Sequence, residues 1–147
     1  MIEVKQISEF FERDLQKLKE EISLYENESD IWQVKNRINN SAGNLCLHIC
    51  GNLQHFIGAI LGNSGYVRHR DNEFGLKNIQ RLKLISEIDT TISAVKSTLE
   101  KMSPADFEKE YPAEVMNRKW RTDQFLIHLL THLNYHLGQV NYHRRLI

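Results

Sequence analysis

The sequence predicts an all-α protein built as a four-helix bundle. Apolar residues recur at helical spacing in four segments, and no segment alternates between apolar and polar residues as a strand does. The two prolines are Pro104 and Pro112, so residues 1–103 contain none and can form long helices. A chain of 147 residues suits one domain, 1–147. Four helices of about 20 residues would surround its single core.

Each expected helix is bounded by signals in the sequence. Gly62–Gly65 is a strong stop for the second helix, and Thr122 is expected to cap the start of the fourth. Ser103 followed by Pro104 predicts a short additional helical turn between the third and fourth helices. The four helices are expected from about Ile7 to Tyr25, Ile38 to Leu61, Leu82 to Met102 and Thr122 to Arg145, with a turn at Asn27–Asp30.

Composition argues against several classes of function. The chain has 19 Lys and Arg against 19 Asp and Glu, a formal net charge of zero, which disfavours nucleic acid and anionic membranes as partners. Residues 38–67 carry no charged side chain, but Asn, Gln and His interrupt them, so a buried helix is expected rather than a membrane span. The first residues lack the apolar region of a signal peptide. We therefore expect a cytoplasmic protein.

The connection from Tyr66 to Arg81 is long for two packed helices, which points to a function. It contains the charged residues Arg68, Arg70, Asp71 and Glu73. These side chains are expected to form an ion-pair network that pins the loop. The alternative is that they clamp an anionic substrate.

Histidine is enriched in the chain, with seven in 147 residues. In the last helix a stripe about 120° wide contains His and Gln, and in the second helix a narrow line contains His and Asn. Both lines border apolar residues, so their uncharged polar groups need partners. The stripe consists of Gln124, His128, His132, His136, Gln139 and His143, and the line of Asn44, His48, Asn52 and His55.

A divalent metal ion is one such partner. Imidazoles four residues apart on a helix can both bind one ion at about 2.1 Å, whereas His128 and His136 are separated by about 12 Å of helix rise. The last helix can therefore supply either His128 with His132 or His132 with His136. The third ligand would be His48 or His55. The competing interpretation is a metal-free core of hydrogen-bonded histidines.

Several other residues are expected to have simpler roles. Cys46 and Cys50 lie four residues apart in an apolar segment and are expected to be small buried side chains rather than redox or metal groups. His69 and His143 are expected at the surface or at a helix end. Packing is also expected to explain Trp32 and Trp120, and Tyr135 and Tyr142 are expected in the core or at an interface.

Three motifs make the chain resemble the DinB-like superfamily, to which bacillithiol S-transferases and mycothiol-dependent maleylpyruvate isomerases belong. The segment from His132 to Gln139 is similar to the H-x-x-x-H-x-G-Q motif of the family's last helix. The segment from His48 to Asn52 lies where the family places its third histidine. The segment from Arg68 to Phe74 is similar to the R-x-R-D-x-E-F segment of one branch of unknown function.

The resemblance implies that His48, His132 and His136 hold a divalent metal ion, usually Zn or Ni. It also implies an up-down-down-up order of helices and a homodimer, and it does not imply DNA binding. Nearby polar side chains would orient the metal ligands or bind a small-molecule substrate, and the candidates are Asn52, His55, His128, Gln139, Arg70 and Asp71.

The reaction is open at this stage. The resemblance implies a metal-dependent transferase or hydrolase in which the ion activates a thiol or water. The sequence shows neither a serine or cysteine nucleophile with its base nor a phosphate-binding glycine loop. Two alternatives stay open: a non-catalytic bundle that uses the same histidines for binding or sensing, and a purely structural bundle.

Overall fold

The computed structural model describes residues 3–147, so Met1 and Ile2 of the predicted domain 1–147 lie outside the described residues. Across residues 3–147 the protein is helical and forms no strand, which confirms the all-α class. Two isolated β-bridges brace the loop before the last helix, Glu110 with Arg121 and Val115 with Arg118. In this part of the chain no helix has the length and apolar character needed to cross a bilayer.

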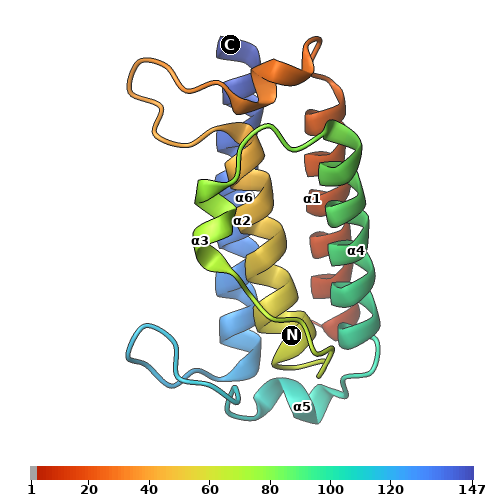
Figure 1. The fold of residues 1–147 in the computed structure, drawn as a ribbon. Coiled ribbons are helices and arrows are strands. Elements are labelled where there is room, and N and C mark those ends of the chain that lie inside the picture. Colours follow the sequence, from red (N-terminus) through yellow and green to blue (C-terminus); the bar gives the residue numbers. More distant parts are fainter. Residues whose placement is uncertain (1–2) are drawn as a thin grey trace.

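Four long helical segments lie side by side, each overlapping one of the predicted helices (Figure 1). They are α1 (Val4–Ser23), α2 (Ala42–Leu53) with its continuation as the π-helix η2 (Gln54–Ala59), α4 (Arg81–Leu99) and α6 (Thr122–Leu146). Three short helices occupy the connections: the 3₁₀-helix η1 (Glu28–Trp32), α3 (Arg70–Gly75) and α5 (Pro104–Glu108). As predicted, Ser103 caps α5, and Pro104 is its first residue.

Two polar clusters join α1 to α6. Asn134 Nδ2 donates to Asp14 Oδ2 at 3.1 Å, and Asn141 Nδ2 donates to Glu21 Oε1 at 2.8 Å. Both pairs have the same sequence separation of 120 residues, so α1 and α6 run in the same direction. Arg144 Nε also donates to Glu21 Oε2 at 2.7 Å. Burial would raise the pKa of Glu21, but these hydrogen bonds outweigh it and lower that pKa.

The third long helix, α4, runs opposite to α1. Lys19 pairs with Asp89 at 2.8 Å, and Lys96 pairs with Glu12 at 3.3 Å, so the pairing order is reversed along the two helices. Figure 1 shows α2 and α4 running together in the sense opposite to α1 and α6. The buried apolar residues of all four segments form one core, and it includes the two free cysteines, as predicted.

One predicted helix start and one predicted cap are wrong. The second helix begins at Ala42 rather than at Ile38, because the Ser41 hydroxyl accepts a hydrogen bond from the Asn44 backbone N–H and caps it there. Thr122 is not the cap of α6 but its first helical residue, and the cap is Arg121. The Thr122 hydroxyl donates instead to the carbonyl of Lys109, which ties the start of α6 to the preceding loop.

Of the two places expected for His143, the surface is wrong, since its side chain is 3% exposed. The helix end is confirmed, since His143 lies in the last turn of α6. Its Nε2 donates to the carbonyl of Gln33 at 2.8 Å, and its Nδ1 accepts from the Tyr25 hydroxyl at 2.6 Å. His143 thus links α6 to the segment after α1. Tyr135 and Tyr142 are exposed on α6, which excludes a core role and leaves the interface role as a prediction.

We expect the contribution of His143 to folding stability to depend on pH. Burial lowers its pKa, although the bond to Gln33 acts in the opposite direction. The unfolded state therefore takes up a proton at higher pH than the native state. The stabilisation is fully present above the unfolded pKa of about 6.5 and is lost as the pH falls below it.

Urea unfolding of metal-free protein at about pH 7.5 and about pH 5.5 measures this effect. The loss of unfolding free energy between the two conditions should be smaller in His143→Gln than in the unsubstituted protein. His69 is exposed, so His69→Gln should keep the full loss. The same loss in His143→Gln as in the unsubstituted protein would contradict the assignment.

Candidate metal centre

Three histidine side chains converge between α2 and α6. His132 Nε2 lies 3.2 Å from His48 Nε2 and 3.1 Å from His136 Nε2. Ligand atoms of all three residues lie within 4.8 Å of one another. Of the two pairs that the spacing left open on the last helix, the structure brings His132 and His136 to the cluster, and His48 faces them from α2.

The hydrogen bonds behind the cluster decide which nitrogens carry hydrogen. His48 Nδ1 lies 2.9 Å from Glu73 Oε1, and an ionised carboxylate can only accept, so this nitrogen is the donor. His136 Nδ1 lies 2.7 Å from Gln139 Oε1 and donates to it in the same way. The Nε2 atoms of His48 and His136 therefore present lone pairs toward His132.

This arrangement fits a divalent cation. A single hydrogen on His132 Nε2 can be donated to only one of its two nitrogen neighbours, which leaves the lone pair of the other without a donor. An ion among the three nitrogens would accept all three lone pairs. Nitrogens bound to one tetrahedral ion at about 2.1 Å are about 3.4 Å apart, close to the separations in the cluster.

Electrostatics keep His132 and His136 neutral. Burial, followed by the neighbouring histidines, lowers the pKa of His132 to about 4. Burial also lowers the pKa of His136, although its bond to Gln139 acts in the opposite direction. At neutral pH both rings are therefore unprotonated, the form in which imidazole binds metals. Because His132 and His136 are only half-buried, a bound ion would keep one side open.

Glu73 of α3 is the partner that orients His48. Its carboxylate is buried, and it accepts from Arg68 Nε at 2.8 Å and Nη2 at 2.9 Å as well as from His48. Burial would raise the pKa of Glu73, but the bonds from Arg68 and His48 outweigh it and hold that pKa below its ordinary value. The network predicted for the long connection thus forms between Arg68 and Glu73.

The sequence did not show that Glu73 reaches the metal-ligand side chain, because the two residues lie 25 positions apart. The sequence contains one sign of this contact: Gly51, three residues after His48, has no side chain at the place where the carboxylate approaches α2. A Cβ atom at Gly51 would meet Glu73 Oε2 at 2.1 Å and Cδ at 2.7 Å. Only glycine leaves room for this carboxylate against α2.

The other residues predicted near the site lie in different surroundings. Asn52 is buried one turn from His48, and its Oδ1 has no hydrogen-bond partner within residues 3–147. His128 is half-buried beside the rings of Trp120 and Phe125, at centroid distances of 5.3 and 5.8 Å. His55 is half-buried beside Phe56, at 4.7 Å.

Arg70 and Asp71 do not join the ion-pair network. Both are exposed at the start of α3, and the Arg70 guanidinium lies 5.3 Å from the centroid of the Phe74 ring. His69, which precedes them, is exposed as predicted. The alternative role of this segment, a clamp for an anionic substrate, stays a prediction.

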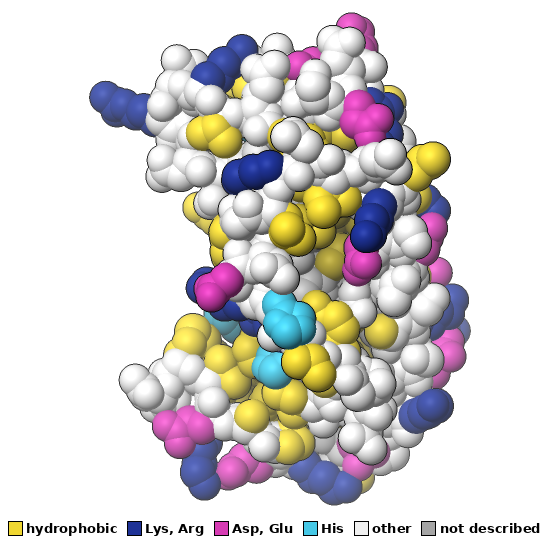
Figure 2. Space-filling view, in the orientation of Figure 1, with side chains coloured by type: hydrophobic (Ala, Val, Ile, Leu, Met, Phe, Trp, Pro, Cys, Tyr) yellow, Lys and Arg dark blue, Asp and Glu magenta, His cyan; other side chains and the backbone are white. Residues whose placement is uncertain are grey.

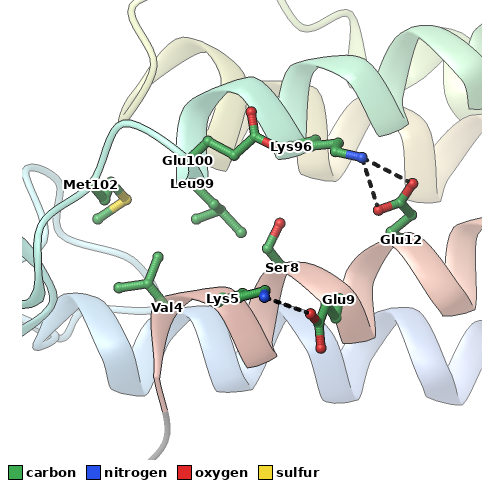
Figure 3. A pocket seen from close by; sticks show the side chains of 9 residues that line it. All are labelled: Val4, Lys5, Ser8, Glu9, Glu12, Lys96, Leu99, Glu100 and Met102. Carbon is green, nitrogen blue, oxygen red and sulfur yellow. Dashed lines mark hydrogen bonds and ion pairs between the residues drawn. The ribbon is translucent and has the colours of Figure 1, made fainter.

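Some histidine side chains reach the molecular surface. Figure 2 shows histidine side chains at the surface about halfway along the molecule, beside hydrophobic side chains and next to a concave outline. The pocket in Figure 3 is a different one, between α1 and α4, with a volume of about 490 Å³. Its charges pair with each other, Lys96 with Glu12 and Lys5 with Glu9, and no histidine lines it.

The close approach of Glu73 gives a test of the orienting contact. We expect Gly51→Ala to displace the Glu73 carboxylate and to lower Zn²⁺ affinity about 10- to 100-fold, the usual effect of losing such a partner. Gly75→Ala is the matched control, because a Cβ atom there meets nothing within 4 Å. Affinities follow from competition with a chromophoric chelator. Unchanged affinity in Gly51→Ala would show that Glu73 does not orient His48 for metal.

Comparison with known proteins gives one match. A family model described as "Protein of unknown function (DUF1572)" matches residues 3–147. The comparison with curated proteins found no match, and neither did the comparison with solved structures. The match extends over nearly the whole chain, including all three histidines of the cluster and the Arg68–Glu73 segment. The chain belongs to the DUF1572 family.

Proposed function

We propose that this protein binds one divalent metal ion through His48, His132 and His136, and that with this ion bound it acts as a metal-dependent transferase or hydrolase. The observation that carries the proposal is the convergence of three Nε2 atoms, two of which have their tautomer fixed by Glu73 and Gln139. Three neutral nitrogens with one side open are the ligand set of a catalytic rather than a closed structural zinc site.

Family membership supports the same proposal, because DUF1572 is a DinB-like family. We infer from the resemblance that the four long helices form the up-down-down-up bundle of that superfamily. Zn or Ni is the proposed metal, and a homodimer is the proposed assembly. A small molecule is the proposed substrate.

The side chains around the cluster have separate roles in this proposal. A bound ion would lower the pKa of a coordinated thiol or water and so supply the nucleophile. Glu73 accepts a hydrogen bond from His48 Nδ1, and Gln139 Oε1 accepts one from His136 Nδ1. These bonds direct both Nε2 atoms toward one point. Asn52 and His128 lie one helical turn from the ligands and are the proposed contacts for substrate.

A non-catalytic binding or sensing role is the second candidate. It is favoured by the ion-pair network, because Arg68 and Glu73 connect the cluster to α3 and to the long connection. A bound ion would stabilise that connection through His48 and could report metal to another molecule. This role needs metal binding but no chemistry.

Metal binding by the histidine cluster can be measured directly. Protein purified without a polyhistidine tag should contain about one Zn or Ni per chain or take it up when the metal is added, as elemental analysis and chelator competition measure. His132→Ala removes the central nitrogen and should lower Zn²⁺ affinity more than 100-fold, beyond the roughly 10- to 100-fold effect of an orienting partner. His69→Ala, at an exposed histidine outside the cluster, should leave affinity unchanged.

Metal should also stabilise the fold, since it binds the native state alone. A rise in Tm with added Zn²⁺ is expected for the unsubstituted protein and for His69→Ala, but not for His132→Ala. No stoichiometric metal, together with equal affinity and equal Tm in all three proteins, would refute the metal site and favour the structural bundle.

A comparison of reaction rates separates catalysis from metal binding alone. The metal-loaded protein should transfer a thiol to an electrophile or hydrolyse an ester or amide faster than His48→Ala under the same conditions. Residual metal in each sample is measured, so that rates are compared per bound ion. Metal binding without any difference in rate across these assays would support the sensing role instead.

A further inference from the structure

The pocket between α1 and α4 lies apart from the metal centre (Figure 3). Its volume of about 490 Å³ falls in the range of small-molecule sites, about 300–1,000 Å³. The lining contains the apolar side chains of Val4, Leu99 and Met102, the hydroxyl of Ser8 and several charged side chains. No histidine lines the pocket, so a ligand bound here would not touch the proposed metal ligands.

A small residue at a core position of α1 accounts for this pocket. Ser8 is only 9% exposed, and it belongs to a row of buried residues that recur every three or four positions along α1. The other members of the row are large and apolar: Phe11, Leu15, Leu18 and Ile22. Because a serine side chain is smaller than any of these, it leaves space between the helices that a leucine would fill.

The packing of α1 against α4 places Ser8 in the wall of the pocket. Two ion pairs set the register of these antiparallel helices: Lys19 with Asp89, and Glu12 with Lys96. Four residues before Glu12, this register brings Ser8 opposite the end of α4, where Leu99 is fully buried. The serine therefore lies between apolar side chains rather than in open solvent.

The Ser8 hydroxyl is available to a ligand. Hydroxyl groups within a helix often donate to the carbonyl four residues earlier, as Ser23 does to Lys19 and Thr98 does to Ala94. Within residues 3–147 the Ser8 hydroxyl forms no hydrogen bond, and it points from α1 toward α4, into the pocket (Figure 3). A polar group that is nine-tenths buried needs a partner, and the pocket is where that partner can bind.

The charged side chains at the pocket favour a neutral ligand. Lys96 Nζ lies 3.3 Å from the Glu12 carboxylate, and Lys5 Nζ lies 4.0 Å from that of Glu9. These four charges compensate one another. The remaining one, Glu100, is exposed and hydrated, so it does not call for a counter-ion.

We propose that this pocket binds a small neutral organic molecule. Its apolar body packs against Val4, Leu99 and Met102, and its hydroxyl or carbonyl group forms a hydrogen bond with Ser8. Burial of apolar surface supplies most of the affinity, and the single hydrogen bond fixes the orientation of the ligand. This inference needs no metal ion and goes beyond the proposed function.

Benzyl alcohol is the probe, and toluene has the same ring without the hydroxyl group. Binding is followed by amide chemical shifts of the isotope-labelled full chain. We expect saturable binding of benzyl alcohol with shifts at residues 4–12 and 96–102. Ser8→Ala should lower the affinity for benzyl alcohol about 2- to 10-fold, as the loss of one neutral hydrogen bond does, and leave the affinity for toluene unchanged. Ser93→Ala, at an exposed position of α4 outside the pocket, should change neither affinity.

A filled pocket gives a second readout. Ser8→Leu should abolish binding of benzyl alcohol and raise the urea midpoint of unfolding, because it replaces a buried hydroxyl and fills the space beside it. Lack of saturable binding to the unsubstituted protein overturns the proposal. Equal benzyl alcohol affinity in Ser8→Ala also overturns it, and would mean that Ser8 holds an ordered water only. Tighter binding of benzoate or benzylammonium than of benzyl alcohol overturns the neutral ligand class.

Discussion

The carboxylate of Glu73 is a buried negative charge, and the orientation of His48 in the histidine cluster depends on how that charge is compensated. A buried carboxylate is strongly destabilising unless hydrogen-bond donors surround it. Here Arg68 supplies two donors and His48 a third, and Gly51 leaves the space in which the carboxylate lies against α2. The same contact fixes α3 on α2 and sets the tautomer of His48. The position of the loop and the orientation of His48 therefore depend on the same hydrogen bonds.

The remaining ligands are positioned by regular helix geometry. His132 and His136 lie one turn apart on α6, and Gln139 follows one turn later to orient His136. Because α6 packs on α2, both histidines face His48 across the helix interface. The three histidines therefore meet without distortion of α2 or α6 at His48, His132 and His136. The π-helix η2 begins at Gln54, beyond His48. The open side of the cluster is the half-buried surface of α6.

Sequence reasoning located the helices and the histidine lines but not the contacts between distant segments. Periodicity predicted the four long helices, and Ser103 with Pro104 predicted α5 at its observed start. The helix start expected at Ile38 was wrong because periodicity does not reveal that Ser41 caps the helix. The cap role expected for Thr122 was wrong because its hydroxyl donates to the Lys109 carbonyl instead. His143 was misjudged because its partners, Tyr25 and Gln33, lie more than 100 residues away.

Local patterns along the chain are enough to predict the all-α class, the helical stripe of histidines and the limit of two proposed metal ligands from the last helix. These follow from local geometry, since the rise and twist of a helix fix which neighbours can share an ion. The packed helices were needed to show that His48 rather than His55 joins the cluster, and that Glu73 and Gln139 accept hydrogen bonds from its rings. Those choices depend on which faces of α2, α3 and α6 pack together, and that packing is a property of the whole core.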